Sequence, residues 1–187
     1  TEACDEPSGY VDNDEDCDDS DENVNPSASD SIFEDRNCDG VTSGSDLSLA
    51  DYGFLGESSS DNSGYVVSDA GDVDGDGLDD ILVGAPYNAD GGSYAGKTYL
   101  ILGASLGGSS EIGLSLADYS FVGENGSDYS GFSVSTAGDV DGDGLDDILI
   151  GAPYNSDVGG QAGKVYLILG ASLGSTSEIE LSDADYS

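Results

Sequence analysis

The chain has 187 residues, and its 40 acidic residues against 3 basic ones give a formal net charge of −37. Such a polyanion does not bind nucleic acid, whose phosphates require Lys and Arg, and it is repelled by anionic membranes. The absence of His removes the commonest general base and the commonest transition-metal ligand. No apolar run approaches transmembrane length. Self-repulsion of this size opposes a compact state. We therefore expect bound divalent cations, with a salt-adapted surface as the alternative.

Residues 1–45 form an acidic segment with few apolar residues, and they contain all the cysteines, Cys4, Cys17 and Cys38. Clustered cysteines predict an oxidising, extracellular setting, and their odd number leaves one over. The segment is rich in hard oxygen donors, which suit calcium. The candidate ligands are Asp12, Asp14, Asp16, Asp18, Asp19 and Asp21. A disordered acidic linker is the alternative interpretation.

This segment resembles the MopE-type metal-binding motif of secreted bacterial proteins at residues 4, 7–11, 16–20, 25–26 and 37–40. Cys38 matches the last cysteine of that motif, and a middle cysteine is missing. The resemblance favours a Cys4–Cys17 pair. Copper is associated with that family, but this chain has no His or Met to hold it, so calcium is the expected ion.

From residue 46 onward the chain is a tandem repeat. We assign repeat 1 to residues 46–117, repeat 2 to 118–184, and the start of a truncated third copy to 185–187. Residues 71–88 match 138–155 with one difference, Val83 against Ile150. We expect the array to continue in a parent protein, or to be completed by a neighbouring chain.

Short apolar runs bounded by Gly, Asp or Pro predict four strands in each copy. The predicted strands are 52–55, 65–70, 80–83 and 97–102, then 119–122, 132–137, 147–150 and 164–169. The runs at 81–83 and 99–102 are continuous, which predicts strands covered on both faces. Four antiparallel strands are the make-up of a propeller blade. The predicted fold class is therefore all-β, with tandem four-stranded propeller-type blades.

An acidic loop occurs once in each copy, beginning at Asp72 and at Asp139, which are 67 residues apart. Calcium takes six to eight oxygen ligands, and carboxylates at loop positions 1, 3, 5 and 9 with a carbonyl at position 7 can supply them. The predicted ligands are Asp72, Asp74, Asp76, Leu78 and Asp80 in copy one, and Asp139, Asp141, Asp143, Leu145 and Asp147 in copy two. Gly77 and Gly144 permit the sharp turn. A flexible acidic turn is the alternative.

An EF-hand is excluded, because its bidentate Glu at position 12 is replaced by Val83 and Ile150. The site is thus expected to be strand–loop–strand. Together with Gly64-Tyr65, Gly84-Ala85-Pro86 and Gly96-Lys97, and their counterparts Gly131-Phe132, Gly151-Ala152-Pro153 and Gly163-Lys164, the loops resemble the FG-GAP repeat of integrin alpha-subunit β-propellers and their bacterial relatives. The resemblance covers about residues 46–187. It implies a four-stranded blade with calcium in the hairpin between its first two strands. Family propellers usually have seven blades, whereas this chain holds two repeats.

The remaining motifs are weaker indicators of function. Two Gly-Ala-Ser-Leu-Gly segments, around Ser105 and Ser172, match a hydrolase nucleophile elbow, but that elbow needs a His base and a following helix. We interpret both as turns. Paired carboxylates could cleave a glycoside, but they are better explained as cation ligands. We expect Lys97 and Lys164 to form local ion pairs, and Asn125 opens one N-glycosylation sequon.

These observations predict a secreted, extracellular or cell-surface, calcium-binding structural or adhesive protein that is not an enzyme. Its near-identical units favour stacking into a fibre or surface assembly, so self-association or neighbouring repeats are the expected partners. An integrin-like propeller fragment that binds a carbohydrate or protein ligand is one alternative. A non-catalytic stalk of a larger secreted enzyme is another. Neither nucleic acid nor membrane insertion is expected.

Overall fold

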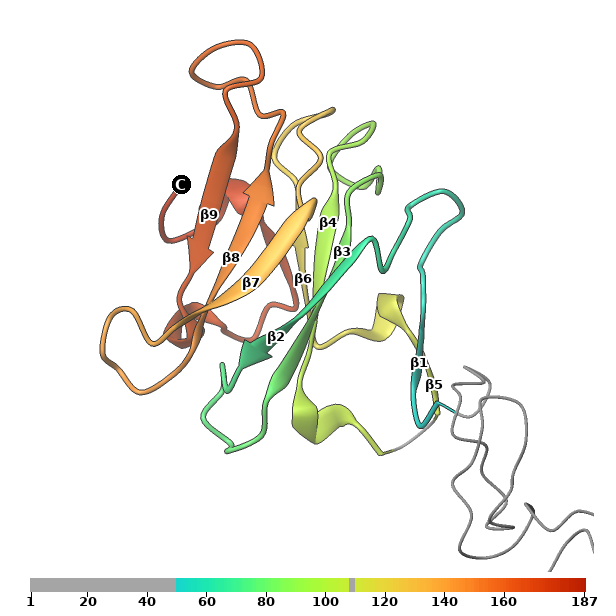
Figure 1. The fold of residues 1–187 in the computed structure, drawn as a ribbon, viewed down its shortest axis with the longest axis vertical. Coiled ribbons are helices and arrows are strands. Elements are labelled where there is room, and N and C mark those ends of the chain that lie inside the picture. The colour runs from blue at the N-terminus through green and yellow to red at the C-terminus, as the bar shows by residue number, and fades with distance from the viewer. Residues whose placement is uncertain (1–49, 108–109) are drawn as a thin grey trace, which may run out of the picture. The chain divides into compact units, whose positions relative to one another are not determined.

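The structure is a computed structural model that describes residues 50–107 and 110–187 (Figure 1). Its residues Tyr52–Ser187 form one unit. The predicted cysteine pair and the candidate ligands Asp12, Asp14, Asp16, Asp18, Asp19 and Asp21 lie outside the described residues. The described part is all-β: it contains ten strands and four short 3₁₀ turns, and no α-helix.

All eight predicted strands are present, with ends shifted by at most two residues. In chain order they are β1 (Gly53–Leu55), β2 (Val66–Gly71), β3 (Asp80–Ala85), β4 (Lys97–Ile101), β6 (Tyr119–Val122), β7 (Ser133–Gly138), β8 (Asp147–Ala152) and β9 (Lys164–Ile168). Two further strands, β5 (Glu111–Gly113) and β10 (Glu178–Glu180), were not predicted. They are three-residue segments with a single apolar residue each, too short to show a period of two.

The strands form two main sheets and a separate pair. The first sheet has the order β10-β6-β4-β3-β2, antiparallel except where β10 runs parallel to β6. The second sheet is β7-β8-β9, and β1 pairs in parallel with β5. The strands of the two sheets lie side by side in Figure 1.

The first sheet includes a strand from each copy of the sequence repeat. β6 lies in copy two, but it pairs with β4 of copy one, where Tyr119 faces Leu100. The second sheet shows the same relation, because Tyr186 bridges to Leu167. Each main sheet is therefore extended by the Asp-Tyr-Ser segment that follows it in the chain.

The larger core lies between the two main sheets. Leu82, Leu100 and Phe121 of the first sheet share one buried cluster with Ile150 and Tyr166 of the second. A smaller cluster on the other face of the first sheet contains Val83, Tyr99, Ile101 and Leu114. The first sheet is thus covered on both faces, which confirms the prediction from the continuous apolar runs of β3 and β4.

Among the described residues, no helix is long and apolar enough to cross a membrane.

Candidate metal centre

The two acidic loops join β2 to β3 and β7 to β8, at the same end of the unit (Figure 1). Each begins just after a shift in strand register, at Gly71 and Gly138, whose φ angles are 73° and 68°. Only glycine adopts this left-handed conformation at no steric cost. The irregularity ends the ladder and turns the chain into the loop.

The first loop folds its carboxylates inward around its own backbone amides. Asp72 Oδ1 accepts a hydrogen bond from the Gly75 amide at 2.8 Å, and Asp72 Oδ2 accepts one from the Gly77 amide at 3.0 Å. Asp72, Asp74 and Asp80 each offer an oxygen, and these three oxygens lie within 4.8 Å of one another. Three acids that repel one another are therefore held together in one place.

The second loop repeats this arrangement with one change of partner. Asp139 accepts hydrogen bonds from the amides of Gly142 at 2.7 Å and Gly144 at 3.0 Å. Here the oxygens that lie within 4.8 Å of one another belong to Asp139, Asp141 and Asp143. The cluster is exposed throughout, whereas in the first loop Asp80 is buried.

The structure thus brings three predicted ligands of each loop together. Of the remaining carboxylates, Asp76 accepts a hydrogen bond from the Leu78 amide at 2.8 Å, and Asp147 lies in the sheet at the start of β8. Leu145 donates its amide to Asp143 at 2.9 Å.

The acids at position nine, Asp80 and Asp147, also organise the backbone. Asp80 accepts the amides of Val73 at 2.9 Å and Gly103 at 2.8 Å, and so ties the loop to the turn after β4. Asp147 does the same with Val140 and Gly170. Burial raises the pKa of Asp80, although the two amide hydrogen bonds oppose the shift. Each carboxylate oxygen has two lone pairs, so an amide bond leaves room for a further ligand.

The two loops are also in contact with each other, which sequence reasoning missed. The Asp72 amide donates to Asp146 Oδ2 at 2.9 Å, and the Asp146 amide donates to the Asp72 carbonyl at 3.0 Å. Asp146 was not among the predicted ligands. Only the pairing of the sheets places it beside the other loop, so no local pattern could identify it.

Lys97 and Lys164 form the ion pairs expected for them. Lys97 is buried, and its Nζ contacts Asp90 at 2.7 Å, Glu57 at 3.2 Å and Glu178 at 3.4 Å. Lys164 contacts Glu124 at 2.8 Å and Asp157 at 3.0 Å. Burial alone lowers the pKa of Lys97, but the hydrogen bonds that its Nζ donates to Asp90 and Glu57 outweigh burial, so the net shift of the pKa is upward.

Glu57 and Glu124 also accept hydrogen bonds from buried tyrosines, Tyr99 at 2.8 Å and Tyr166 at 2.9 Å. Burial raises the pKa of both phenols, and the neighbouring carboxylates add to the shift. Each glutamate follows β1 or β6, the first strand of its own repeat, so these contacts tie that segment to β4 or β9 of the same repeat.

The two elbow serines lie in 3₁₀ turns, Gly103–Ser105 and Gly170–Ser172, as interpreted. Ser105 donates its hydroxyl to Asp118, and Ser172 donates to Asp185, both at 2.6 Å. Each serine thus fixes the Asp-Tyr-Ser segment that runs alongside the sheet.

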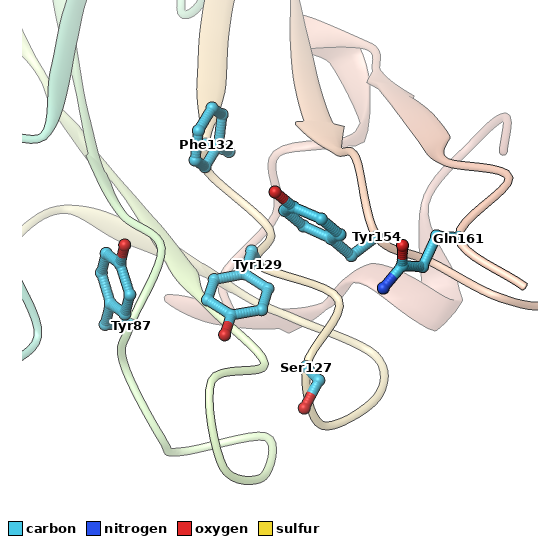
Figure 2. A pocket seen from close by; sticks show the side chains of 6 residues that line it. All are labelled: Tyr87, Ser127, Tyr129, Phe132, Tyr154 and Gln161. Carbon is cyan, nitrogen blue, oxygen red and sulfur yellow. The ribbon is translucent and has the colours of Figure 1, made fainter.

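The opposite end of the strands carries an aromatic pocket of about 350 Å³, which sequence reasoning also missed (Figure 2). Its lining residues come from three loops of both repeats. They are Tyr87, Ser127, Tyr129, Phe132, Tyr154 and Gln161. Figure 2 shows Tyr129 between Tyr87 and Tyr154, and its ring centroid lies 5.4 Å from that of Tyr87 and 5.1 Å from that of Tyr154.

Comparison with known proteins agrees with the repeat pattern. The family described as FG-GAP repeat matches residues 63–101 and 130–168. Integrin alpha-PS2 of Drosophila melanogaster is 38% identical over 108 residues, which are 55% of this chain and 7% of that protein. Integrin alpha-5 of Xenopus laevis is 36% identical over 135 residues, 70% of this chain and 12% of that protein. Integrin alpha pat-2 of Caenorhabditis elegans is 38% identical over 89 residues, 48% of this chain and 7% of that protein.

The chain thus spans only about a tenth of the length of these curated relatives. The matched segments each begin before the first strand of a hairpin, include one acidic loop, and end within β4 or β9. The sequence repeat, the sheet topology and the FG-GAP match coincide on the same residues. Residues 63–101 and 130–168 of this chain each match the FG-GAP repeat.

Proposed function

We propose that this chain is a calcium-binding structural or adhesive module of an extracellular, cell-surface protein, with no catalytic activity. The observation that carries the proposal is the convergence of three carboxylates within 4.8 Å in each loop. In a chain of net charge −37, such clusters are destabilising unless a cation neutralises them. Their donors are hard oxygens, which calcium prefers over transition metals.

The proposed ligands in the first loop are Asp72, Asp74, Asp76 and Asp80 with the Leu78 carbonyl. In the second they are Asp139, Asp141, Asp143 and Asp147 with the Leu145 carbonyl. Bound calcium would supply positive charge there, and the chain's own contribution is to hold the carboxylates in place through the glycine amides of each loop. The aspartates of residues 12–21 are a further proposed site.

Isothermal titration with calcium tests this assignment. We expect two sites in the unmodified chain beyond any in residues 1–45. Asp74→Asn and Asp141→Asn should each weaken one site at least tenfold, because a neutral amide replaces a charged ligand. Asp69→Asn, which makes the same change at an exposed position in β2, is the matched control. Equal calcium binding by all three variants would contradict the proposal.

An uncovered face of the second sheet supports the proposal that the chain associates with itself. In the first sheet, Leu82 and Thr98 are fully buried under the second sheet. Their counterparts in the second sheet are Leu149, which is partly buried, and Val165, which is 59% exposed. The same apolar face is covered in one repeat and uncovered in the other. We infer that a neighbouring repeat, in a second copy of the chain, covers it in an assembly.

Light scattering in calcium and after chelation tests this part. We expect large assemblies in calcium that dissociate when calcium is removed. Val165→Lys should prevent assembly, because it places an unpaired charge on the proposed contact, whereas Val67→Lys, at an exposed position in β2, should not. A monomer in calcium for the unmodified chain would exclude the fibre.

A ligand-binding integrin-like fragment is the second candidate, and the observation that favours it is the similarity to integrin alpha subunits over more than half of the chain. A stalk on a larger enzyme has no specific observation in its favour.

A further inference from the structure

We propose that the aromatic pocket between the two repeats binds a neutral saccharide. The pocket lies at the end of the strands opposite the acidic loops. β7 runs toward its loop from the pocket residue Phe132, and β2 runs toward its loop from Tyr65, whose ring packs against that of Phe132 with centroids 4.9 Å apart. It is therefore separate from the proposed calcium sites. The inference goes beyond the cation role of those loops and does not depend on it.

The pocket lining carries no charge, although the chain is strongly acidic. The chain carries 40 acidic residues, yet all six residues that line the pocket are uncharged. Five of the six carry a hydroxyl or an amide, and the sixth, Phe132, is aromatic. Its volume of about 350 Å³ is within the roughly 300–1,000 Å³ range of small-molecule sites. A neutral ligand matches this lining, whereas an anionic one would be repelled by the surrounding acids.

The tyrosine rings in and beside the pocket are partly exposed and lie in defined orientations. Tyr154 is 42% exposed and Tyr94 is 47% exposed, although large aromatic side chains are normally buried. Tyr94 stacks on Tyr129 with an angle of 8° between the rings and 5.7 Å between their centroids. The neighbouring rings are held at steep angles to this pair. Such flat, fixed faces suit the C–H face of a sugar ring.

The backbone of Tyr129 is strained. Its φ angle is 55°, a left-handed conformation that is an outlier for a bulky residue. The equivalent residue of the first repeat, Asn62, has φ 54°, and Asn tolerates this conformation far better. The fold therefore requires the conformation but does not require Tyr. A residue that carries strain without a structural need indicates a functional role.

Neutral hydrogen-bonding side chains lie beside the aromatic rings. A second hollow of about 310 Å³, which the carboxylates of Asp128 and Asp157 also line, shares Ser127, Tyr154 and Gln161 with the pocket and adds Asn125 and Ser156. These side chains offer hydroxyl and amide groups, which can donate and accept as sugar hydroxyls do. Aromatic faces beside neutral polar groups thus form one continuous surface.

The charged groups near this surface are already engaged. Asp128 is buried and accepts hydrogen bonds from Asn155 at 2.8 Å and Asn125 at 3.3 Å. Asp157 forms an ion pair with Lys164 at 3.0 Å. Because these carboxylates have partners, a cationic ligand gains less here than an open acidic site would offer.

The test is binding of neutral oligosaccharides, namely chitotriose, maltotriose, mannotriose and lactose, to the full chain in calcium-containing buffer. Saturation-transfer NMR and tyrosine fluorescence, which no Trp obscures, provide the readouts. We expect saturable binding of at least one sugar. Tyr129→Asn and Tyr154→Ala should each weaken that binding at least tenfold. Tyr52→Asn, at an exposed tyrosine outside the ring cluster, should leave it unchanged.

Tyr129→Asn restores the residue of the first repeat, so it should keep or raise the melting temperature, and lost binding cannot then be attributed to unfolding. Two further arms use tetramethylammonium and an oligolysine peptide, because aromatic rings also attract cations. Binding of these cations without any sugar would overturn the proposal. Failure of all four sugars to bind would do so too, as would sugar binding that survives Tyr129→Asn.

Discussion

At the scale of single residues, the two repeats place the same lysine in different surroundings. Lys97 is almost fully buried and has three carboxylate partners, one of which, Glu178, comes from β10. Lys164 is more exposed and has two. A buried charge that loses its partner is far more costly than an exposed one. The matching lysines thus offer a comparison within one chain.

We predict that Lys97→Met lowers the free energy of unfolding by about 3–5 kcal/mol, because it leaves Glu57 beside Tyr99 without its cation. Lys164→Met should cost about 1 kcal/mol, since solvent screens the carboxylates it releases. Methionine keeps the apolar stem of lysine, so packing is preserved. Urea unfolding in calcium measures both values. Equal losses would show that burial does not distinguish the two lysines.

At the scale of elements, the sequence predicted each hairpin well and the contacts between hairpins poorly. The Gly and Asp residues around 71–80 mark where β2 ends and β3 begins, because turn chemistry is local. No local sequence pattern predicts that Tyr119–Val122 pairs with β4, or that Asp146 contacts Asp72. Pairing over such distances depends on the packing of the whole unit.

The aromatic pocket was missed for the same reason, since its residues come from three separate loops. One signal was present in the sequence. Within nearly identical repeats, Asn62 corresponds to Tyr129 and Tyr94 to Gln161. Both differences are at the junction of the repeats. The positions at which the two copies differ therefore indicate the pocket, just as the positions at which they agree indicate the acidic loops.

The close approach of the repeats explains one glycine of each Gly-Ala-Pro motif. A Cβ atom at Gly84 would clash with the backbone carbonyl of Gly131 in the other repeat. At Gly151 the nearest atom is the Ser133 hydroxyl, which can rotate away. We predict that Gly84→Ala costs about 3 kcal/mol and Gly151→Ala about 1 kcal/mol, by overpacking. Thermal unfolding of both variants measures the difference, and a greater loss for Gly151→Ala would contradict this packing.

At the scale of the whole molecule, charge is the dominant constraint. A net charge of −37 acts against every compact form of the chain. Both acidic loops lie at one end of the unit and touch through Asp72 and Asp146, so their repulsion is concentrated there. Bound calcium would therefore stabilise the fold at the point of greatest strain, and metal binding would be coupled to folding.

The most direct test of this account is the melting temperature in calcium, in chelator, and in sodium chloride of matched ionic strength. Two sites filled at about 100 times their dissociation constant each contribute about 2.7 kcal/mol, which corresponds to a rise of roughly 10–20 °C over the chelated chain. Sodium chloride should restore little of this, because screening does not fill a ligand site. A chain with both Asp74→Asn and Asp141→Asn should lose this response of the melting temperature to calcium. A melting temperature that is the same in calcium, chelator and salt would contradict it.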